Sequence, residues 1–266
     1  MAGNGEQATI DGTGTDASLW GASGIEQIGG HVYIASRFAI RVYDIRTGDV
    51  STLAGSGTPG SGCADSQNPA EARFGPNAGL VTDGMYLYTI SDCGETDKRL
   101  RRIEIATGAT STLLALNPNT CVACLSSHDL VMAPDGHIYV TAPPDAILRV
   151  NPGTGSSSTF ANVPSGVWSI AADASHLWVV GSAPTGNTIY KIALVDGSVS
   201  EVVTSSSMSP GGALAVDDSD VYVSGEYDGD ILRYPLAGGS VEFVVGSGTG
   251  GANGLRDFEL SDGALW

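Results

Sequence analysis

Cysteine thiols are the side chains of this chain best suited to redox or metal chemistry. Cys121 and Cys124 stand close together, a spacing found in thiol–disulfide exchange and in metal binding. No helix is expected there to lower a thiol pKa, and no second close pair completes a zinc site. We therefore expect Cys121 and Cys124 to form a small disulfide that closes a loop.

Carboxylates are the second group with catalytic or metal-binding chemistry. Two carboxylates brought together can cleave glycosides, whereas calcium takes about six to eight oxygen ligands. The densest acidic runs, residues 11–16 and 217–220, complete no calcium-loop motif, so we expect turns there and predict no cofactor, with calcium as the alternative. The candidates for paired carboxylates are Asp92, Glu226, Asp228 and Asp257.

The balance of charge excludes two classes of partner. The chain has 29 acidic and 12 basic residues, a formal net charge of −17 at pH 7, which repels nucleic acids and anionic membranes. No apolar run approaches the roughly 20 residues that span a bilayer, and the first residues lack the features of a signal peptide. The even number of cysteines still favours an exported protein, so we predict an extracellular or cell-surface location, with the export signal absent from this sequence.

A repeated pair of strands must position these residues. Each copy is an apolar strand, a short turn, and a second strand with an aromatic residue near its start. The turns contain glycine, aspartate or serine, which suit the tight bend of a hairpin. The six copies begin at Gly24, Ala78, Asp129, Ser169, Ala213 and Asp257.

A second hairpin follows five of these six copies. The two hairpins make four antiparallel strands per repeat, at a period of about 40 to 55 residues, which is typical of one blade of a β-propeller. The first strand of each second hairpin contains a basic residue. Because it recurs at one strand position, we expect a shared structural role for Arg41, Arg102, Arg149, Lys191 and Arg233.

The segment between the first two repeats indicates the type of repeat. It combines strand, Thr-Gly turn, strand, a glycine-rich acidic loop and an Ala-x-Phe-x-Pro motif, and the later repeats lose that motif. The matching residues are Ala54-Gly55, Ala72-Arg73-Phe74 and Pro76, with an earlier copy at Asp11-Gly12 and Ala17-x-x-Trp20. In this order of elements the chain resembles the NHL-repeat family. The resemblance implies an all-β fold, a β-propeller, with residues 1–266 as a single domain.

The resemblance also implies six blades, of which the last is incomplete in this chain. The sequence ends at Trp266, inside the second strand of the sixth repeat. Three explanations are open: the chain is a fragment of a longer protein, residues 5–10 close a reduced blade, or a partner chain completes it. We favour the first.

Histidines raise a zinc hypothesis, because one NHL-like group, the peptide-amidating lyases, holds catalytic zinc with histidines. His31, His137 and His176 each follow the first hairpin turn of a different repeat. Zinc ligands must lie about 2 Å from a common metal, which residues spread around a ring cannot do. Only His128 is expected near the axis, so we predict no metal site.

The long loops of such a propeller gather on one face, which we call the loop face. Loops on a rigid scaffold carry function more often than strands do. Cys63 and Cys93 lie in loops of the second blade on this face, and we predict a disulfide between them. The residues expected to contact a ligand are Arg37, Phe38, Asp92, Glu95, His128, Trp168, Glu226, Tyr227, Asp228 and Arg256.

Two functions fit this pattern. The first is a noncatalytic module of a secreted or cell-surface protein that binds protein or glycan through its loop face. The alternative is a propeller lyase or hydrolase that acts at the central channel with acidic residues or a metal. We predict the first, because the repeat specifies a fold more than an activity and no catalytic residue is identified. The RNA binding of some NHL proteins would need more free cations.

Overall fold

The protein is described from a computed structural model that divides into two compact units, Met1–Leu125 and Ser126–Trp266. Each unit is described by itself. The structure describes residues 2–58, 62–94, 97–116, 129–142, 144–164, 166–183, 186–205, 208, 213–224, 231–237, 242–245, 260–261 and 264–265.

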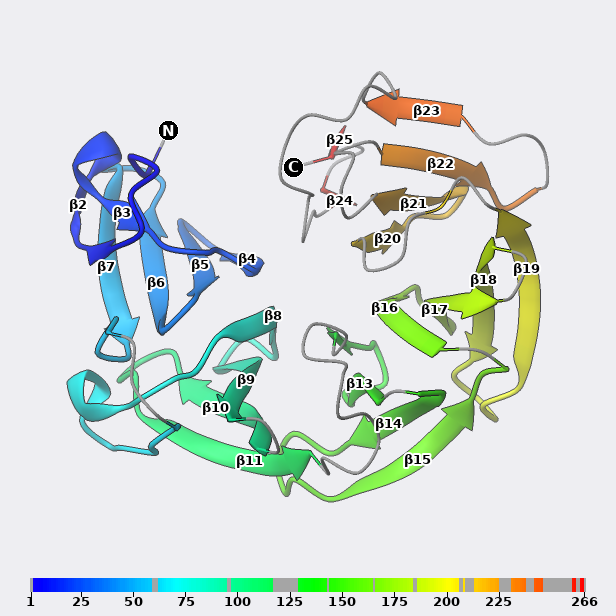
Figure 1. Ribbon diagram of the computed structural model, residues 1–266, viewed down its shortest axis with the longest axis horizontal. Coiled ribbons are helices and arrows are strands. Elements are labelled where there is room, and N and C mark those ends of the chain that lie inside the picture. The colour runs from blue at the N-terminus through cyan, green and yellow to red at the C-terminus, as the bar shows by residue number, and fades with distance from the viewer. Residues whose placement is uncertain are drawn as a thin grey trace. The chain divides into compact units, whose positions relative to one another are not determined.

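The first unit contains two antiparallel sheets, whose strands Figure 1 labels. One sheet has the spatial order β2-β7-β6-β5-β4 and the other the order β11-β10-β9-β8, while β1 pairs with β3. The bounds are β1 Thr9–Ile10, β2 Gly12–Thr13, β3 Ser18–Leu19, β4 Gly24–Ile28, β5 His31–Ser36, β6 Ala39–Asp44, β7 Asp49–Ala54, β8 Asn77–Thr82, β9 Tyr86–Gly94, β10 Asp97–Glu104 and β11 Thr110–Leu116, with short 3-10 helices η1 at Gly14–Asp16 and η2 at Pro69–Glu71.

The second unit contains three antiparallel four-stranded sheets and one shorter hairpin within the described residues. In each sheet the strands follow the order of the sequence. The bounds are β12 Leu130–Met132, β13 Ile138–Ala142, β14 Ala146–Val150 and β15 Ser157–Asn162; β16 Gly166–Ala172, β17 His176–Ala183, β18 Gly186–Ala193 and β19 Val199–Ser205; β20 Leu214–Val216, β21 Asp220–Ser224, β22 Ile231–Pro235 and β23 Glu242–Val245; and the hairpin β24 Leu260–Ser261 and β25 Ala264–Leu265.

All six predicted hairpins are present. They are β4–β5, β8–β9, β12–β13, β16–β17, β20–β21 and β24–β25. The N-terminal segment belongs to the first unit, because β1 pairs with β3 and β2 extends the sheet beyond β7. In the part of the chain that is described, no helix is long and apolar enough to cross a membrane.

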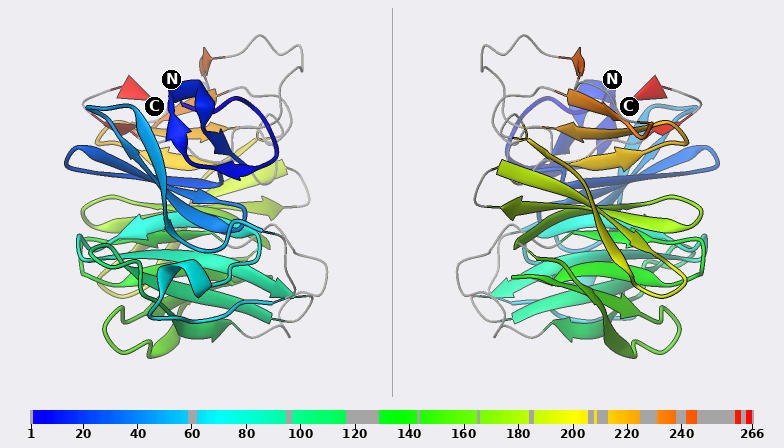
Figure 2. Two further views of the ribbon diagram at one scale, coloured as in Figure 1. Left: turned by 90° about the vertical axis from the view of Figure 1, so that its left-hand side faces the viewer. Right: turned by 90° about the vertical axis from the view of Figure 1, so that its right-hand side faces the viewer.

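Apolar side chains fill the space between neighbouring sheets of each unit. The first strands of successive sheets are in contact, β4 with β8, and β12 with β16 and β16 with β20. Figure 2 shows the strands of the first unit in its left view and those of the second unit in its right view. The buried clusters between sheets include Tyr33, Phe74 and Leu87 in the first unit, and Tyr139, Ile147, Leu177, Trp178, Val221 and Leu232 in the second.

An aspartate, an aromatic ring and a basic residue recur together at the first hairpin turn of four sheets. The aspartate accepts hydrogen bonds from the backbone of the turn, and its second oxygen accepts one from the ring's hydroxyl or indole N–H. A basic residue on the third strand lies opposite the ring. The sets are Asp83, Tyr88 and Arg102; Asp135, Tyr139 and Arg149; Asp173, Trp178 and Lys191; and Asp217, Tyr222 and Arg233. Asp217 therefore has the turn role that we predicted. Four of the five basic residues, all except Arg41, have the predicted structural role.

The fifth basic residue, Arg41, does not occupy the expected position. Each third strand has a bulge where it pairs with the fourth strand, and Arg41 follows the bulge directly, as Arg101 does, whereas Arg102 comes one residue later. Val42 therefore stands where the sequence alignment placed Arg41. Sequence comparison missed this shift because a bulge of one residue leaves the apolar pattern nearly unchanged.

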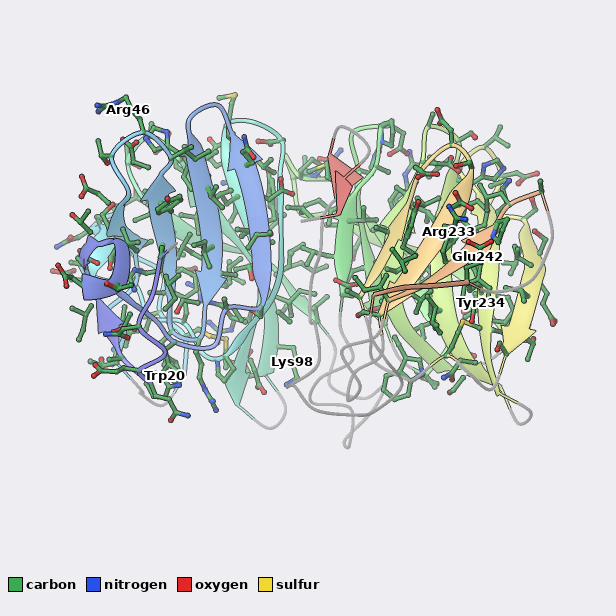
Figure 3. The ribbon with its side chains drawn as sticks, turned by 90° about the horizontal axis from the view of Figure 1, so that it is seen from above. Trp20, Arg46, Lys98, Arg233, Tyr234 and Glu242 are labelled. Carbon is green, nitrogen blue, oxygen red and sulfur yellow. A yellow bond between two sulfur atoms is a disulfide. The ribbon has the colours of Figure 1, made fainter. Side chains whose placement is uncertain are left out.

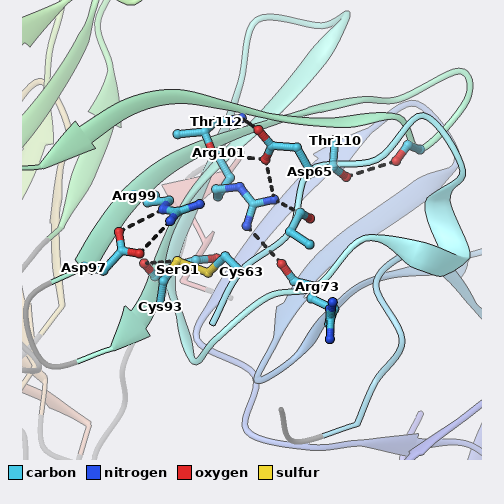
Figure 4. Close-up of polar contacts among 12 residues, drawn as sticks. Cys63, Asp65, Arg73, Ser91, Cys93, Asp97, Arg99, Arg101, Thr110 and Thr112 are labelled. Carbon is cyan, nitrogen blue, oxygen red and sulfur yellow. Dashed lines mark hydrogen bonds and ion pairs between the residues drawn. A yellow bond between two sulfur atoms is a disulfide. The ribbon is translucent and has the colours of Figure 1, made fainter. Parts of the chain in front are cut away.

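Arg41 and Arg101 instead hold the segments that resemble the NHL pattern. Each is fully buried, and each donates to two backbone carbonyls and one carboxylate. Arg101 binds the carbonyls of Ala64 and Arg73 and the carboxylate of Asp65, whose oxygens also accept from Thr112 (Figure 4). Arg41 makes the same contacts with the carbonyls of Ile10 and Ser18 and with the Asp11 carboxylate, which also accepts from the Thr52 hydroxyl.

The shared geometry corrects a second alignment. Because the carbonyl of Ser18 matches that of Arg73, the equivalent of the Ala72-Arg73-Phe74 motif is Ala17-Ser18-Leu19 and not Ala17-x-x-Trp20. The later sheets have Leu148, Tyr190 and Leu232 after their bulges, so none of them has an arginine at this position.

Candidate functional site

The structure describes four of the predicted ligand-contact residues, Arg37, Phe38, Asp92 and Trp168. The others, together with the second predicted disulfide and one carboxylate candidate, lie outside the described residues: Glu95, His128, Glu226, Tyr227, Asp228, Arg256, Cys121, Cys124 and Asp257.

Arg37 and Phe38 form the turn between β5 and β6, since Ser36 pairs with Ala39. Arg37 is exposed and Phe38 is buried. The Arg37 guanidinium carbon lies 5.7 Å from the ring centre of Trp20 and 5.6 Å from that of Phe38, and the two rings meet edge to face at 5.2 Å. The turn thus holds one cation against two aromatic rings.

Asn77 links the turn that carries Arg37 to the strand that carries Asp92. Its side-chain amide donates to the carbonyl of Ser36 at 2.8 Å, and its carbonyl oxygen accepts from the Ser91 hydroxyl. Asn77 is buried at the start of β8. The sequence analysis missed it, although a polar residue directly after Pro76 and before an apolar strand was a usable signal.

Asp92 lies beside the disulfide of the first unit. Cys63 and Cys93 are bonded, which confirms the predicted pair. Asp92 forms an ion pair with the buried Lys98, whose Nζ lies 2.7 Å from the carboxylate. Figure 3 labels Lys98 and Trp20 at one end of this unit's strands and Arg46 at the other end.

Asp129 is the most perturbed carboxyl group of the second unit. It precedes β12, and its two oxygens accept from the backbone N–H groups of Leu130 and Ile170, so it ties β12 to β16. Burial raises the pKa of the Asp129 carboxyl to about 6, against the lowering effect of these two hydrogen bonds. The residue retains some exposed surface although protein atoms surround its carboxyl group. A carboxyl group with this pKa can exchange protons near neutral pH.

Trp168 and Ser169 directly precede the residue that binds Asp129. The ladder between β16 and β17 shifts register between Val167 and Ser169, so Trp168 occupies a bulge. Its indole Nε1 and the Ser169 hydroxyl are buried and have no hydrogen-bond partner among the described residues. A buried donor left without a partner costs about 1–3 kcal/mol.

The three described histidines lie at hairpin turns. His31 is 4.0 Å from Asp44, while the imidazoles of His137 and His176 lie 3.4 Å from Asp135 and Asp173. Each of these carboxylates belongs to a turn of the same sheet. The described residues bring no three potential metal ligands together.

Solved structures with a similar fold include two sugar dehydrogenases. One is a putative oxidoreductase (glucose dehydrogenase) from Thermus thermophilus, with 19% identity, a TM-score of 0.70, and coverage of 97% of this chain and 91% of that one. The other is the PQQ-bound aldose sugar dehydrogenase from Streptomyces coelicolor, with 17% identity, a TM-score of 0.64, and coverage of 90% and 84%.

A lyase has a similar fold as well. Virginiamycin B lyase from Staphylococcus aureus is 16% identical, with a TM-score of 0.55 and coverage of 84% of this chain and 69% of that one. Comparisons with protein-family models and with curated protein sequences found no match.

The chain is an all-β protein with the β-propeller fold. This confirms the predicted fold class, and the described part contains five sheets as blades, with the hairpin β24–β25 after them.

The predicted function was wrong. We expected a noncatalytic binding module, but two similar structures, which match 97% and 90% of this chain, are sugar dehydrogenases, and they favour the alternative of a propeller enzyme.

Proposed function

We propose that this β-propeller is an enzyme, a lyase or hydrolase, in which Asp129 removes a proton from the substrate or from an attacking water. The observation that carries the proposal is the Asp129 carboxyl group, with its pKa raised to about 6 and bound to the backbone N–H of Ile170, the residue that follows the unpaired donors of Trp168 and Ser169 in β16. The similarity to a lyase and to dehydrogenases supports an enzyme of this fold.

The chemistry follows from the protonation state of Asp129. At pH 7 a carboxyl group with a pKa of about 6 is mostly ionised and can act as a general base. In a lyase reaction it would remove a proton from carbon, the C–H electrons would form a double bond, and the leaving group would depart with its own electron pair. In a hydrolase reaction it would remove the proton of an attacking water. Trp168 Nε1 and the Ser169 hydroxyl would donate hydrogen bonds to the substrate oxygen that gains charge.

Turnover assays with Asp129→Asn test this proposal. The probes are virginiamycin B, followed by mass spectrometry, and a panel of aldose esters. We expect Asp129→Asn to lower kcat at least about 100-fold, because general base catalysis contributes about that much. The exposed Asp218 in the same unit provides the control Asp218→Asn, which should retain wild-type rates. Wild-type activity in Asp129→Asn, or no turnover of any probe by the wild type, would overturn the proposal.

The quinone PQQ, bound in one similar structure, does not fit the described residues. Its three carboxylates require several cations. In the first unit Lys98 is paired with Asp92 and Arg99 with Asp97, and of the exposed arginines that are described only Arg37 lies against aromatic rings, which gives one cation for three carboxylates. In the second unit the described cations, Arg149, Lys191 and Arg233, lie at or near the first hairpin turns, with Asp135, Trp178 and Asp220. We derive no step through PQQ.

We further propose that the repeats are of the NHL type and that the protein is exported. The buried arginines Arg41 and Arg101, each with a carboxylate partner and a short Ala-containing segment, support the first point. The Cys63–Cys93 disulfide supports the second, since such bonds persist in oxidising compartments.

A further inference from the structure

Arg37 differs from most cations of this acidic chain because it has no acidic partner among the described residues. The structure records ion pairs for Arg41, Lys98, Arg99, Arg101, Arg149 and Arg233. Arg102 and Lys191 lie over buried or half-buried rings of their own sheets. Arg37 is exposed, as are Arg46 and Arg73, but it alone of these three is recorded against aromatic rings.

The local structure holds Arg37 in place. Its backbone N–H donates to the carbonyl of Trp20 at 2.8 Å, and the same carbonyl accepts from the Ser36 hydroxyl at 2.7 Å. Asn77 fixes the other side of the turn through the carbonyl of Ser36. The backbone of the turn is therefore fixed, and the rings of Trp20 and Phe38 lie against the guanidinium that it carries.

Hydroxyl groups lie next to this turn. Gly55 is packed against it, since a Cβ at Gly55 would lie 2.7 Å from the carbonyl oxygen of Phe38. Ser56 and Thr58 follow directly, both are exposed, and their hydroxyls are 3.0 Å apart. The turn thus carries a planar cation against an aromatic ring, and two exposed hydroxyls follow the residue that packs against its backbone.

We propose that Arg37 and Trp20, with Ser56 and Thr58 on the segment that follows Gly55, bind the carboxylate group of a sugar acid. An arginine fork binds a carboxylate through two parallel hydrogen bonds, and the exposed part of the Trp20 ring offers an apolar face to the ring of the ligand. The net charge of −17 repels anions in general. A carboxylate should therefore bind at a guanidinium that has no acidic partner among the described residues. This subsite is independent of Asp129, which lies in the other unit.

Paired ligands that differ in one group test the proposal. Binding of glucuronate and of glucose to the whole chain would be compared by calorimetry or ligand-observed NMR. Glucuronate should bind at least about tenfold more tightly than glucose, because a charge-assisted hydrogen bond contributes about 1.5–3 kcal/mol. Added salt should weaken the binding of glucuronate.

Arginine variants locate the site. Arg37→Ala should weaken glucuronate binding at least about tenfold, and Arg37→Lys should restore it only in part, because lysine keeps the charge without the planar fork. Arg46→Ala, a change of the same charge on another exposed arginine, should leave binding unchanged. Equal affinity for glucose and glucuronate, or equal losses in Arg37→Ala and Arg46→Ala, would overturn the proposal. Thermal melts of the variants check that each is folded.

Discussion

Single polar side chains in this protein join elements that are distant in sequence. Asn77 bridges Ser36 and Ser91, and Asp129 bridges Leu130 and Ile170. These groups are positioned by their hydrogen bonds to the backbone, which explains how a propeller blade can hold a carboxylate in a fixed and partly desolvated place.

The raised pKa of Asp129 predicts how its stability contribution changes with pH. A folded-state pKa of about 6, above the ordinary value of 3.8, means that ionisation is harder in the folded protein. Asp129 therefore favours the folded state most below pH 4, and this contribution declines as pH rises through 6. Relative to Asp129→Asn, which does not ionise, the wild type should lose about 2–2.5 kcal/mol of unfolding free energy between pH 4 and pH 7.5.

Urea denaturation of both proteins at a series of pH values measures this difference. In Asp129→Asn the side-chain NH2 group faces a backbone N–H, so the two proteins also differ in unfolding free energy by an amount that does not change with pH. Only the pH dependence of the difference is diagnostic. A difference that stays flat from pH 4 to pH 7.5 would show that the carboxyl group titrates normally.

Strand patterns reveal the hairpins of this chain but not their exact register. The alternation of apolar residues and the turn residues around Gly29, Gly84 and Gly136 predicted the hairpins correctly, because both signals are local. Arg41 and Arg102 were aligned although a bulge separates their positions by one residue. Asp129 and Asn77 act across sheets, so no local pattern could indicate their partners.

The one-residue difference between Arg101 and Arg102 predicts losses of stability of different size for the two neighbouring substitutions. Arg101→Ala would leave the Asp65 carboxylate and the carbonyls of Ala64 and Arg73 without their donor and should cost about 3–5 kcal/mol of unfolding free energy. Arg102 lies 4.9 Å from the ring centre of Tyr86, so Arg102→Ala should cost about 0.5–1 kcal/mol.

Chemical denaturation of the two variants under one set of conditions makes this comparison. Similar losses in both would mean that Arg101 does not hold the segment between β7 and β8.

Neighbouring blades approach closely at the turn of the second hairpin of the later blade. A Cβ at Gly108 would lie 2.3 Å from the carbonyl oxygen of Leu53 in the preceding sheet, and φ there is +73°. Gly136 has a similar φ of +77°, but nothing lies within 4 Å of its added Cβ. Gly136→Ala should cost about 1–2 kcal/mol from the backbone conformation alone. Gly108→Ala should cost about 1–3 kcal/mol more, because the sheets must also move apart. Thermal or urea unfolding of the pair separates the two contributions.

The same contact occurs once in each compact unit, which allows a test of the prediction that residues 1–266 form one domain. A Cβ at Gly197 would lie 2.8 Å from the carbonyl oxygen of Phe160, as that of Gly108 would approach Leu53. If the chain unfolds as one domain, Gly108→Ala and Gly197→Ala should each lower the temperature of a single transition, and the calorimetric and van't Hoff enthalpies should agree. If the two units unfold independently, calorimetry should show two transitions, with Gly108→Ala lowering one and Gly197→Ala the other. Indole fluorescence would assign them, because Trp20 reports on the first unit and Trp168 and Trp178 report on the second.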